Sequence, residues 1–245
     1  MDGYGPESFG QFYAQEYDTL HDPGTTDVSV DRIARLAGSG RVLELAVGTG
    51  RIALPLAERG IRIEGIEISP EMVAKLRTKP GGAELPVTIG DMEDVGVSGP
   101  FDLILLVFNT LFNLTTQRAQ VRLFQNVARC LAPGGAFLVE AFVPDPARFR
   151  GHQDVRVRNL TLDSVCFDGI LHDPVAQTLT MQRLWATGDR TRIVPLYLRY
   201  AWPSELDLMA ELAGLRLRDR WGGWADEPFT RDSRMHVSVW ERPEM

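Results

Sequence analysis

The chain has 245 residues, of which 44% are hydrophobic and 24% are charged, so it is long enough for one sizeable core and should be globular. Its formal net charge of −7 argues against a nucleic-acid partner, since a nucleic-acid binder normally carries a basic face. The sequence shows no secretory h-region and no apolar run near the ~20 residues of a membrane span, so we expect a cytoplasmic protein with no membrane partner.

The first half of the chain alternates short apolar strands with helices. The pattern predicts strands at 41–47, 61–68, 86–91, 101–109 and 136–143, and helices at 30–38, 51–60, 69–79 and 115–135. The helix start at Ser69 is well marked, because an N-cap serine is followed by proline at the first helical position and an acid in the first turn. Near-continuous apolar strands separated by helices indicate a parallel sheet that is covered on both faces.

The second half changes character near Asp154, where stretches of period-two alternation are separated by turn residues. This pattern predicts an antiparallel meander. A helix at 203–214 and two final strands, read as a hairpin, complete the chain. We therefore expect an α/β fold: a Rossmann-like, doubly wound, mostly parallel seven-stranded sheet with an antiparallel β insertion after strand five. Cys130 and Cys166 are far apart and show no zinc-type spacing, so no metal site is predicted.

A glycine turn, Gly48-Thr49-Gly50, follows the first strand and opens a helix, which is where a backbone can approach a ligand closely. Glu67 ends the next strand, and an acid there can accept two ribose hydroxyls. Asp91 and Met92 end the third strand, where a carboxylate can accept from an adenine amine while Met92 and Ile68 cover the ring. Ligands of such sheets bind at these carboxyl ends.

Each of these features also has a purely structural interpretation. A Gly-x-Gly turn serves tight packing, a strand-end glutamate is often only solvated, and Asp91 is a candidate N-cap. Asn109 and Asn113, at the end of the fourth strand, either face a ligand or cap and turn the chain. Arg51 stands where a dinucleotide-binding turn has its third glycine, which weighs against that class.

Taken in order, four motifs resemble those of class I S-adenosylmethionine-dependent methyltransferases, of the small-molecule, natural-product or amino-sugar type. They are Glu44-Leu-Ala46-Val-Gly48-Thr-Gly50, Glu67, Gly90-Asp91-Met92 and Leu131-Ala-Pro133-Gly134-Gly135. The resemblance covers about residues 10–143 and the closing elements, and it implies S-adenosyl-L-methionine as cofactor and S-adenosyl-L-homocysteine as product. The implied cofactor-binding residues are Tyr13, Tyr17, Glu44, Ala46, Gly48, Thr49, Gly50, Glu67, Ile68, Asp91, Met92, Phe108 and Asn109.

One position departs from the family pattern. The family has glycine where this chain has Ala46, and a methyl group is tolerated there if the backbone φ is negative. Near the N-terminus, Phe9, Tyr13 and Tyr17 recur at a spacing of four and are expected to share one helical face. That face is either a packing stripe or, as the resemblance implies, a lid whose Tyr13 and Tyr17 contact the cofactor or substrate.

The chemistry that the resemblance implies is a direct displacement, in which positioning in a dry site supplies most of the acceleration. A neutral amine needs little base, whereas a phenol, alcohol or indole carbon needs a proton acceptor. His152 and His236 are the catalytic candidates for that role. The candidate substrate-binding residues are Tyr13, Asn113, Tyr197, Tyr200 and Trp224.

The expected function is methyl transfer to an N, O or C atom of a small-molecule acceptor in secondary metabolism, in a desolvated site. The alternatives are an NAD(P)-dependent oxidoreductase and a non-catalytic S-adenosylmethionine-binding protein. One domain, 1–245, is expected, and residues 151–202 are expected to form a substrate lid or the surface of a homodimer. Its parts are an N-terminal helical lid at 1–40, a cofactor-binding core at 41–150, the antiparallel insertion at 151–202, and a closing helix and strands at 203–245.

Overall fold

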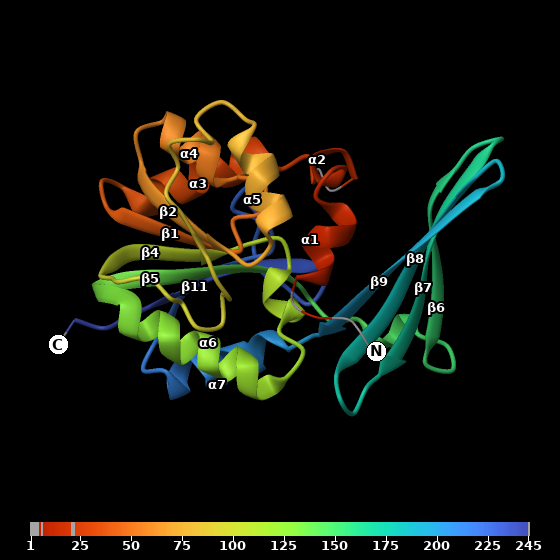
Figure 1. Ribbon diagram of the computed structural model, residues 1–245. Helices are drawn as coiled ribbons and strands as arrows, with labels where there is room; N and C mark the ends of the chain where they lie inside the picture. Colours follow the sequence, from red (N-terminus) through yellow and green to blue (C-terminus); the bar gives the residue numbers. More distant parts are fainter. Residues whose placement is uncertain (1–4, 6, 21–22, 245) are drawn as a thin grey trace.

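A seven-stranded sheet forms the centre of the computed structural model, which describes residue 5, residues 7–20 and residues 23–244 (Figure 1). The strand order is β10-β11-β5-β4-β1-β2-β3, and all neighbours are parallel except β11, which is antiparallel to β5 and β10. The predicted mostly parallel, doubly wound sheet is confirmed. Its strands are β1 (Arg41–Leu45), β2 (Arg62–Glu67), β3 (Val87–Ile89), β4 (Phe101–Leu106), β5 (Leu131–Phe142), β10 (Arg216–Trp221) and β11 (Met235–Glu241).

Helices cover both faces of this sheet, as Figure 1 shows. One core contains apolar residues of α3 (Thr26–Ala37), α4 (Ala53–Glu58) and α5 (Pro70–Arg77), and the other contains those of α6 (Gln117–Cys130) and α7 (Pro203–Leu212). The side chain of Ser69 accepts from the backbone N–H of Met72 at 3.2 Å, which confirms the predicted N-cap of α5.

Several predicted boundaries are wrong: the helix predicted at 30–38 begins at Thr26, and the strand predicted at 136–143 begins at Leu131. The helix predicted at 115–135 ends at Cys130, because Leu131 already pairs with Phe101, and the register then shifts across Pro133-Gly134-Gly135. The strand predicted to reach residue 109 stops at Leu106, because Phe108 and Asn109 turn the chain with φ values of 62° and 65°. A short 3₁₀ helix, η1 (Thr110–Asn113), follows.

The N-terminal segment forms two short helices rather than one, α1 (Ser8–Tyr13) and α2 (Tyr17–Leu20). The prediction that Tyr13 and Tyr17 share one helical face is therefore wrong, and the side chain of Phe9 lies outside the described residues. Gly10 seats α1 against α5, because a Cβ at this position would come 2.0 Å from Ser69 Oγ. A larger residue at position 10 would separate the two helices.

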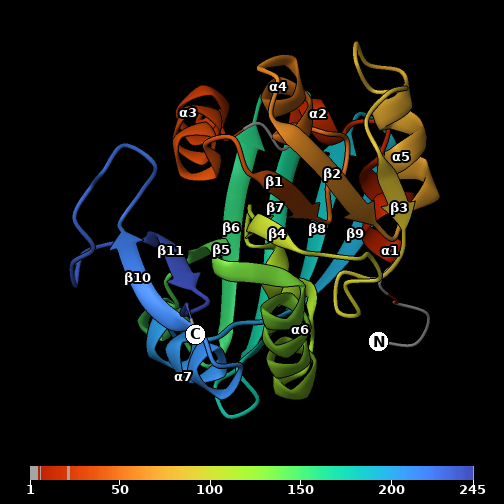
Figure 2. The same cartoon turned by 90° about the vertical axis from the view of Figure 1, so that its left-hand side faces the viewer.

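A second, antiparallel sheet contains β6 (Gln153–Leu160), β7 (Ser164–Asp173), β8 (Thr178–Thr187) and β9 (Arg190–Arg199) in that order. It confirms the β insertion predicted after strand five. Figures 1 and 2 show it standing across the carboxyl ends of the parallel strands of the large sheet, with β9 leading back to α7. Because side chains alternate along each strand, the sheet has one face toward the large sheet and one outer face.

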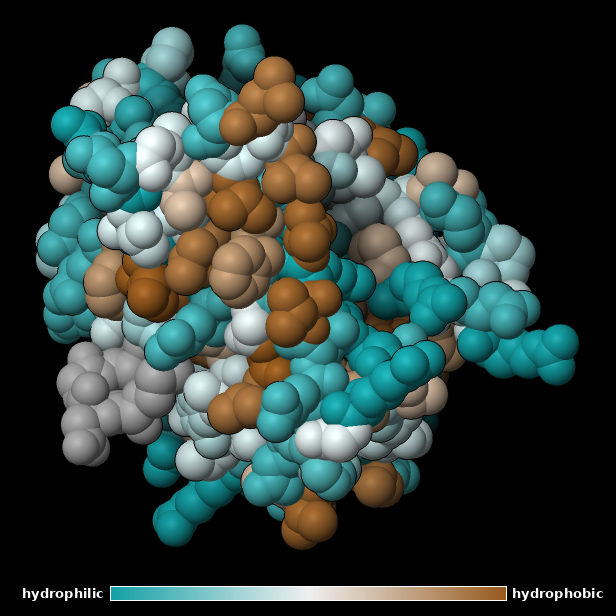
Figure 3. Space-filling view, turned by 90° about the vertical axis from the view of Figure 1, so that its right-hand side faces the viewer, coloured by the Kyte–Doolittle hydropathy of each residue, from teal (hydrophilic) through white to brown (hydrophobic). Residues whose placement is uncertain are grey.

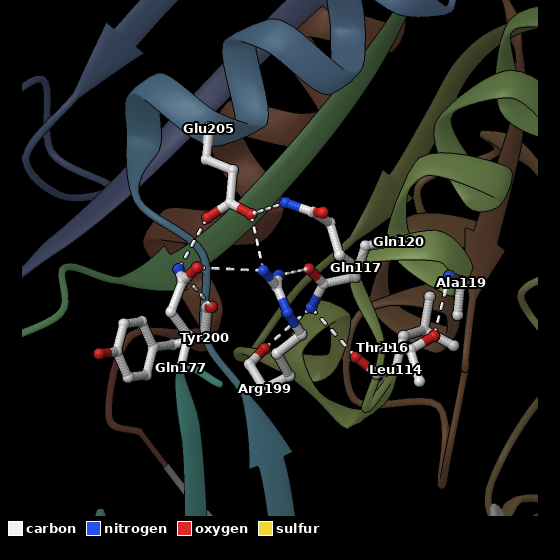
Figure 4. A network of polar contacts seen from close by, with 9 residues as sticks. All are labelled: Leu114, Thr116, Gln117, Ala119, Gln120, Gln177, Arg199, Tyr200 and Glu205. Carbon is white, nitrogen blue, oxygen red and sulfur yellow. Dashed lines mark hydrogen bonds and ion pairs between the residues drawn. The ribbon is translucent and has the colours of Figure 1, made fainter. Parts of the chain in front are cut away.

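A buried polar network fixes the end of β9 to α6 and α7 (Figure 4). The guanidinium of Arg199 donates to Gln120 Oε1 at 2.6 Å and forms an ion pair with Glu205 at 2.7 Å. Gln177 donates to the other carboxylate oxygen of Glu205 at 2.8 Å. Burial alone would raise the pKa of Glu205, but the hydrogen bonds from Gln177, Arg199 and Gln117 outweigh it and hold that pKa below its usual range.

The outer face of the second sheet carries many apolar side chains, and Figure 3 shows an apolar patch over these strands. Its exposed apolar members are Val155, Val157, Leu171 and Ile193. Contiguous exposed apolar surface of this kind marks interaction sites in many proteins. The homodimer expected from the sequence stays a prediction. Among the described residues no helix is long and apolar enough to cross a membrane.

Candidate functional site

A cavity of about 1200 Å³ lies between the carboxyl ends of β1, β2, β4 and β5, the N-terminal helices and the inner face of the second sheet. The order of the large sheet reverses between β1 and β4, which is where open α/β sheets bind ligands. Single-ligand pockets typically have about 300–1,000 Å³, so this cavity has room for a cofactor and an acceptor together. Ten of the thirteen predicted cofactor-binding residues line it: Tyr13, Tyr17, Ala46, Gly48, Glu67, Ile68, Asp91, Met92, Phe108 and Asn109.

Glu67 is held rigidly at the cavity wall by the glycine turn. Its two carboxylate oxygens accept from the backbone N–H groups of Gly48 at 2.8 Å and of Ser69 at 2.9 Å. The backbone N–H of Ile68 also contributes a hydrogen bond to this carboxylate. Burial raises the pKa of Glu67, and the three backbone hydrogen bonds oppose that rise. A carboxylate has about four acceptor positions, so acceptor capacity remains for a ribose hydroxyl.

The glycine turn itself is built on left-handed backbone. Gly48 and Gly50 have φ values of 57° and 82°, and a Cβ at Gly50 would come 2.8 Å from the side chain of Leu54. Ala46, two residues earlier, has φ 53°. The condition for tolerating alanine there, a negative φ, is therefore not met, and Ala46 is a strained position where the family's glycine would be relaxed.

Replacing Ala46 with glycine is expected to raise the free energy of unfolding by about 1 kcal/mol, because the left-handed strain of alanine is removed. Urea unfolding of A46G and the wild type measures this difference. Ala57→Gly in α4 is the matched control and should lower stability by about 0.5–1 kcal/mol, since its backbone is helical. A less stable A46G variant would contradict the strain at this position.

Glu44, Thr49 and Gly50 are buried beneath the cavity wall and do not line the cavity. Thr49 donates its hydroxyl to Asp18 at 2.6 Å, which ties α2 to the turn. Glu44 is fully buried, and its Oε2 has no hydrogen-bond partner within the described part of the chain. Burial raises the pKa of Glu44 to about 8, with the charge of Arg51 opposing the shift. Glu44 is thus a buried acid under the turn with one unpartnered oxygen, whereas the sequence predicted that it contacts the cofactor.

The free energy of unfolding should depend on pH through the titration of Glu44. Its pKa is 4.5 in the unfolded chain and about 8 in the folded one, so the folded protein holds a proton that the unfolded chain releases between these values. Stability from this group is therefore lost as pH rises through that window. Glu44→Gln should lose this slope, so its stability relative to the wild type should increase with pH in urea unfolding. Parallel pH profiles for the two proteins would contradict the buried-acid assignment.

Asp91 and Met92 lie at the end of β3, on the cavity wall next to Glu67. One oxygen of Asp91 accepts from the backbone N–H of Glu93 at 2.8 Å and so holds a turn; the short helix for which Asp91 was a candidate N-cap is not present, since residues 92–95 form a turn. The other oxygen accepts no hydrogen bond from the described residues. Asp91 can therefore hold the turn with one oxygen and accept a hydrogen bond from a ligand amine with the other. Met92 packs partly against the core and Ile68 lines the same wall, which leaves apolar surface for a flat ring.

Phe108 and Asn109 reach the cavity through the turn after β4. The backbone N–H of Phe108 donates to Glu140 Oε2 at 2.8 Å, and Asn109 Oδ1 accepts from the backbone N–H of Phe142 at 2.6 Å. The side-chain carbonyl of Asn109 therefore fixes the turn, which is one of the two interpretations left open from the sequence. The residue also lines the cavity, and a contact with a ligand stays a prediction. Asn113, at the end of η1, lines the cavity as well.

Tyr13 and Tyr17 close the cavity from the N-terminal side. Tyr13 is 2% exposed and meets Trp185 of β8 edge to face, with 6.2 Å between ring centroids. Burial raises the pKa of Tyr17 to about 12, with Arg51 opposing the rise, so its phenol stays protonated at neutral pH. The two tyrosines share the site although they come from different helices.

The structure does not bring either candidate catalytic histidine into the cavity. His236 on β11 is fully buried, its Nδ1 is 2.8 Å from Ser238 Oγ, and burial lowers its pKa to about 3. His152 is exposed in the turn before β6 and is absent from the cavity wall. Their assignment as proton acceptors is therefore corrected, because neither side chain reaches the cavity.

Two of the five substrate-binding candidates also lie elsewhere. Tyr197 points to the outer face of the second sheet, because the alternation of β9 turns Leu196, Leu198 and Tyr200 inward. Trp224 is 3% exposed in the core beside α3, where its carbonyl accepts from Arg32 at 3.0 Å. Tyr13, Asn113 and Tyr200 do line the cavity.

Sequence reasoning missed the inner face of the second sheet. Its cavity-lining members are Asp154, Arg156, Arg158, Ile170, Leu179, Met181, Arg183, Leu196 and Leu198. The period-two pattern of the insertion could have separated these residues from the outer face. It could not show which of the two faces meets the site, since both carry apolar residues.

The comparisons with known proteins agree with this geometry. A family model described as a methyltransferase domain matches residues 42–135. The CcbJ methyltransferase from Streptomyces caelestis has a similar structure, with a TM-score of 0.92 and 34% identity over 98% of this chain and 100% of that one. The chain belongs to the S-adenosylmethionine-dependent methyltransferases. The oxidoreductase alternative finds no support among these relatives.

Two further relatives of this methyltransferase are similar at lower identity. The cypemycin N-terminal methyltransferase of a Streptomyces species is 28% identical over 97% of this chain and 98% of its own length. The S-adenosylmethionine-bound structure of CalS10, an amino pentose methyltransferase from Micromonospora echinaspora, matches with a TM-score of 0.70 and 22% identity, over 94% of this chain and 96% of that one. At that identity the second likeness concerns the fold alone.

Proposed function

We propose that this protein transfers a methyl group from S-adenosylmethionine to an amine nitrogen of a small molecule in secondary metabolism. The cofactor half of the cavity suits the donor. Glu67 offers a carboxylate on the cavity wall to the ribose, Asp91 has an oxygen available for the adenine amine, and Gly48 leaves the turn open. When bound, S-adenosylmethionine supplies a methyl group made electrophilic by its sulfonium sulfur.

We propose that the second sheet acts as the substrate lid. Its inner face and Tyr13 enclose the far side of the cavity with apolar side chains such as Met181, Leu196 and Leu198. These side chains would exclude water and hold the acceptor in line with the donor, which is how such a site gains most of its rate.

The observation that favours nitrogen is the composition of the cavity wall. Among the described residues that line it there is no histidine, lysine or cysteine. Tyr13 is buried, and the phenol of Tyr17 stays protonated at neutral pH. A neutral amine carries its own lone pair, whereas a hydroxyl or a carbon acceptor needs a strong proton acceptor at the reacting atom. The cypemycin N-terminal methyltransferase, which is similar over nearly the whole chain, is named for an N-terminus.

The test is methyl transfer to matched pairs of small acceptors that differ only in an amine or a hydroxyl at the same position. The protein is incubated with S-adenosylmethionine, and mass spectrometry detects the methylated product and S-adenosylhomocysteine. We expect transfer to amines only. Transfer to the hydroxyl partners, or donor binding without transfer to any acceptor of a broad panel, would contradict the proposal.

A further inference from the structure

The cavity wall carries several arginines, although the chain has a net charge of −7. Six line the cavity: Arg122, Arg148, Arg156, Arg158, Arg183 and Arg234. Five of them form ion pairs with carboxylates, namely Arg122 with Glu93, Arg148 with Asp154, Arg158 and Arg183 with Asp168, and Arg234 with Asp145. The backbone of Arg156 pairs with β7, but its side chain has no ion pair or hydrogen bond within the part of the chain that the structure describes.

The reason that Arg156 lacks a partner lies in the sheet register. Arg156 on β6 stands opposite Asp168 on β7, which in turn stands opposite Arg183 on β8. Asp168 is 1% exposed, and both of its oxygens are already occupied, by Arg158 at 2.6 Å and by Arg183 at 2.6 and 3.1 Å. Three guanidinium groups therefore surround one carboxylate.

The neighbours of Arg156 add to this excess of positive charge. Partial burial and then the charges of Arg148 and Arg158 lower the pKa of Arg156, although Asp154 and Asp168 oppose the shift. Among the other carboxylates of the cavity wall, Glu93 and Asp145 are each paired with an arginine, and Glu67 and Asp91 lie at the ends of β2 and β3. No ion pair within the described residues joins any of these four carboxylates to Arg156.

We propose that Arg156 binds an anionic group of the acceptor, a carboxylate or a phosphate, and so selects acceptors that carry negative charge away from the reacting amine. The inference rests on the proposed function, because it assigns the second half of the cavity to the acceptor. A guanidinium presents paired N–H donors that match the oxygens of either group. The ion pairs of Arg158 and Arg183 with Asp168 hold the surrounding sheet in place, which leaves Arg156 available to the ligand.

The test uses two probe anions, inorganic pyrophosphate and succinate, titrated by calorimetry into protein saturated with S-adenosylhomocysteine at constant ionic strength. Wild type is compared with Arg156→Gln and with the control Arg190→Gln. Arg190 also lies on the second sheet, is exposed and has no ion pair among the described residues, but it does not line the cavity. We expect saturable binding of at least one probe to wild type and R190Q, and about tenfold weaker binding to R156Q.

The two probes distinguish the sources of the anion, because preference for pyrophosphate indicates a phosphate-bearing acceptor and preference for succinate a carboxylate-bearing one. Equal affinity of R156Q and wild type, or no saturable binding of either probe to wild type, would overturn the inference. The affinity for S-adenosylhomocysteine, measured first, should be the same in all three proteins. If the wild type does not bind S-adenosylhomocysteine, the proposed function itself fails.

Discussion

Glu67→Gln is expected to weaken the binding of S-adenosylhomocysteine by about 100-fold, which corresponds to losing hydrogen bonds from two hydroxyls to a charged acceptor. In the wild type, the backbone N–H groups of Gly48 and Ser69 donate hydrogen bonds to the carboxylate. The substitution places an amide NH₂ opposite one of these two donors, so that hydrogen bond is lost. The glycine turn and the ribose contact are thus weakened together. Calorimetric titration of the folded variant measures the effect.

The control for this substitution is Glu64→Gln on the same strand. Glu64 is paired with Arg41 at 2.6 Å and does not line the cavity, so its replacement removes the same charge without touching the site. E64Q should bind S-adenosylhomocysteine as the wild type does. An E67Q variant with wild-type affinity would show that the ligand does not use this carboxylate.

Removing Arg199 is expected to lower the free energy of unfolding by about 3–5 kcal/mol, the range for a buried ion pair that loses one partner. In Arg199→Met, Glu205 would keep a carboxylate that is 16% exposed and has lost its charged partner, and Gln120 would lose the hydrogen bond that it now accepts. Chemical unfolding at neutral pH measures the loss. A decrease below about 1 kcal/mol would contradict the role given to this network.

A double substitution and a pH series separate the ion pair from simple packing. Arg199→Met combined with Glu205→Met should be more stable than R199M alone, because no unpaired charge is left buried. The pKa of Glu205 is held below its usual range in the folded protein, so its contribution is present above the unfolded pKa and is lost as pH falls through the folded one. The stability difference between wild type and R199M should therefore shrink in acid.

The same network explains how the second sheet is joined to the core. Gln177 bridges Glu205 and the backbone carbonyl of Tyr200, at 2.8 and 3.2 Å, so the end of β9 is fixed where it carries Tyr200 toward the cavity. Tyr200 also meets His172 Nε2 at 3.0 Å. Loss of Arg199 should accordingly weaken acceptor binding as well as stability.

The cofactor half of the site could be read from the sequence because its residues follow directly from strand ends. Gly48, Glu67 and Asp91 each come at or just after the end of an apolar strand, and the carboxyl ends of parallel strands meet at one edge of the sheet. Local pattern and topology therefore bring them together without any long-range information.

The acceptor half could not be read in this way. Alternation along β9 separates Tyr197 from Tyr200, but only the packing of the second sheet decides that Tyr200 faces inward. His236 was considered for its chemistry, whereas the antiparallel pairing of β11 with β5 and β10 buries it. The φ of Ala46 likewise depends on the turn around it and not on the residue itself.

The central claim is that the methyl donor is bound at the carboxyl ends of the strands and that space for the acceptor lies beside its sulfur. A crystal structure with S-adenosylhomocysteine bound tests this claim most directly. We predict that the two ribose hydroxyls lie within about 3 Å of the carboxylate of Glu67 and that the adenine amine lies as close to Asp91. We also predict that the sulfur faces the space between Tyr13 and the inner face of the second sheet. A ligand bound outside this cavity, or bound in it without contacting Glu67, would contradict the account.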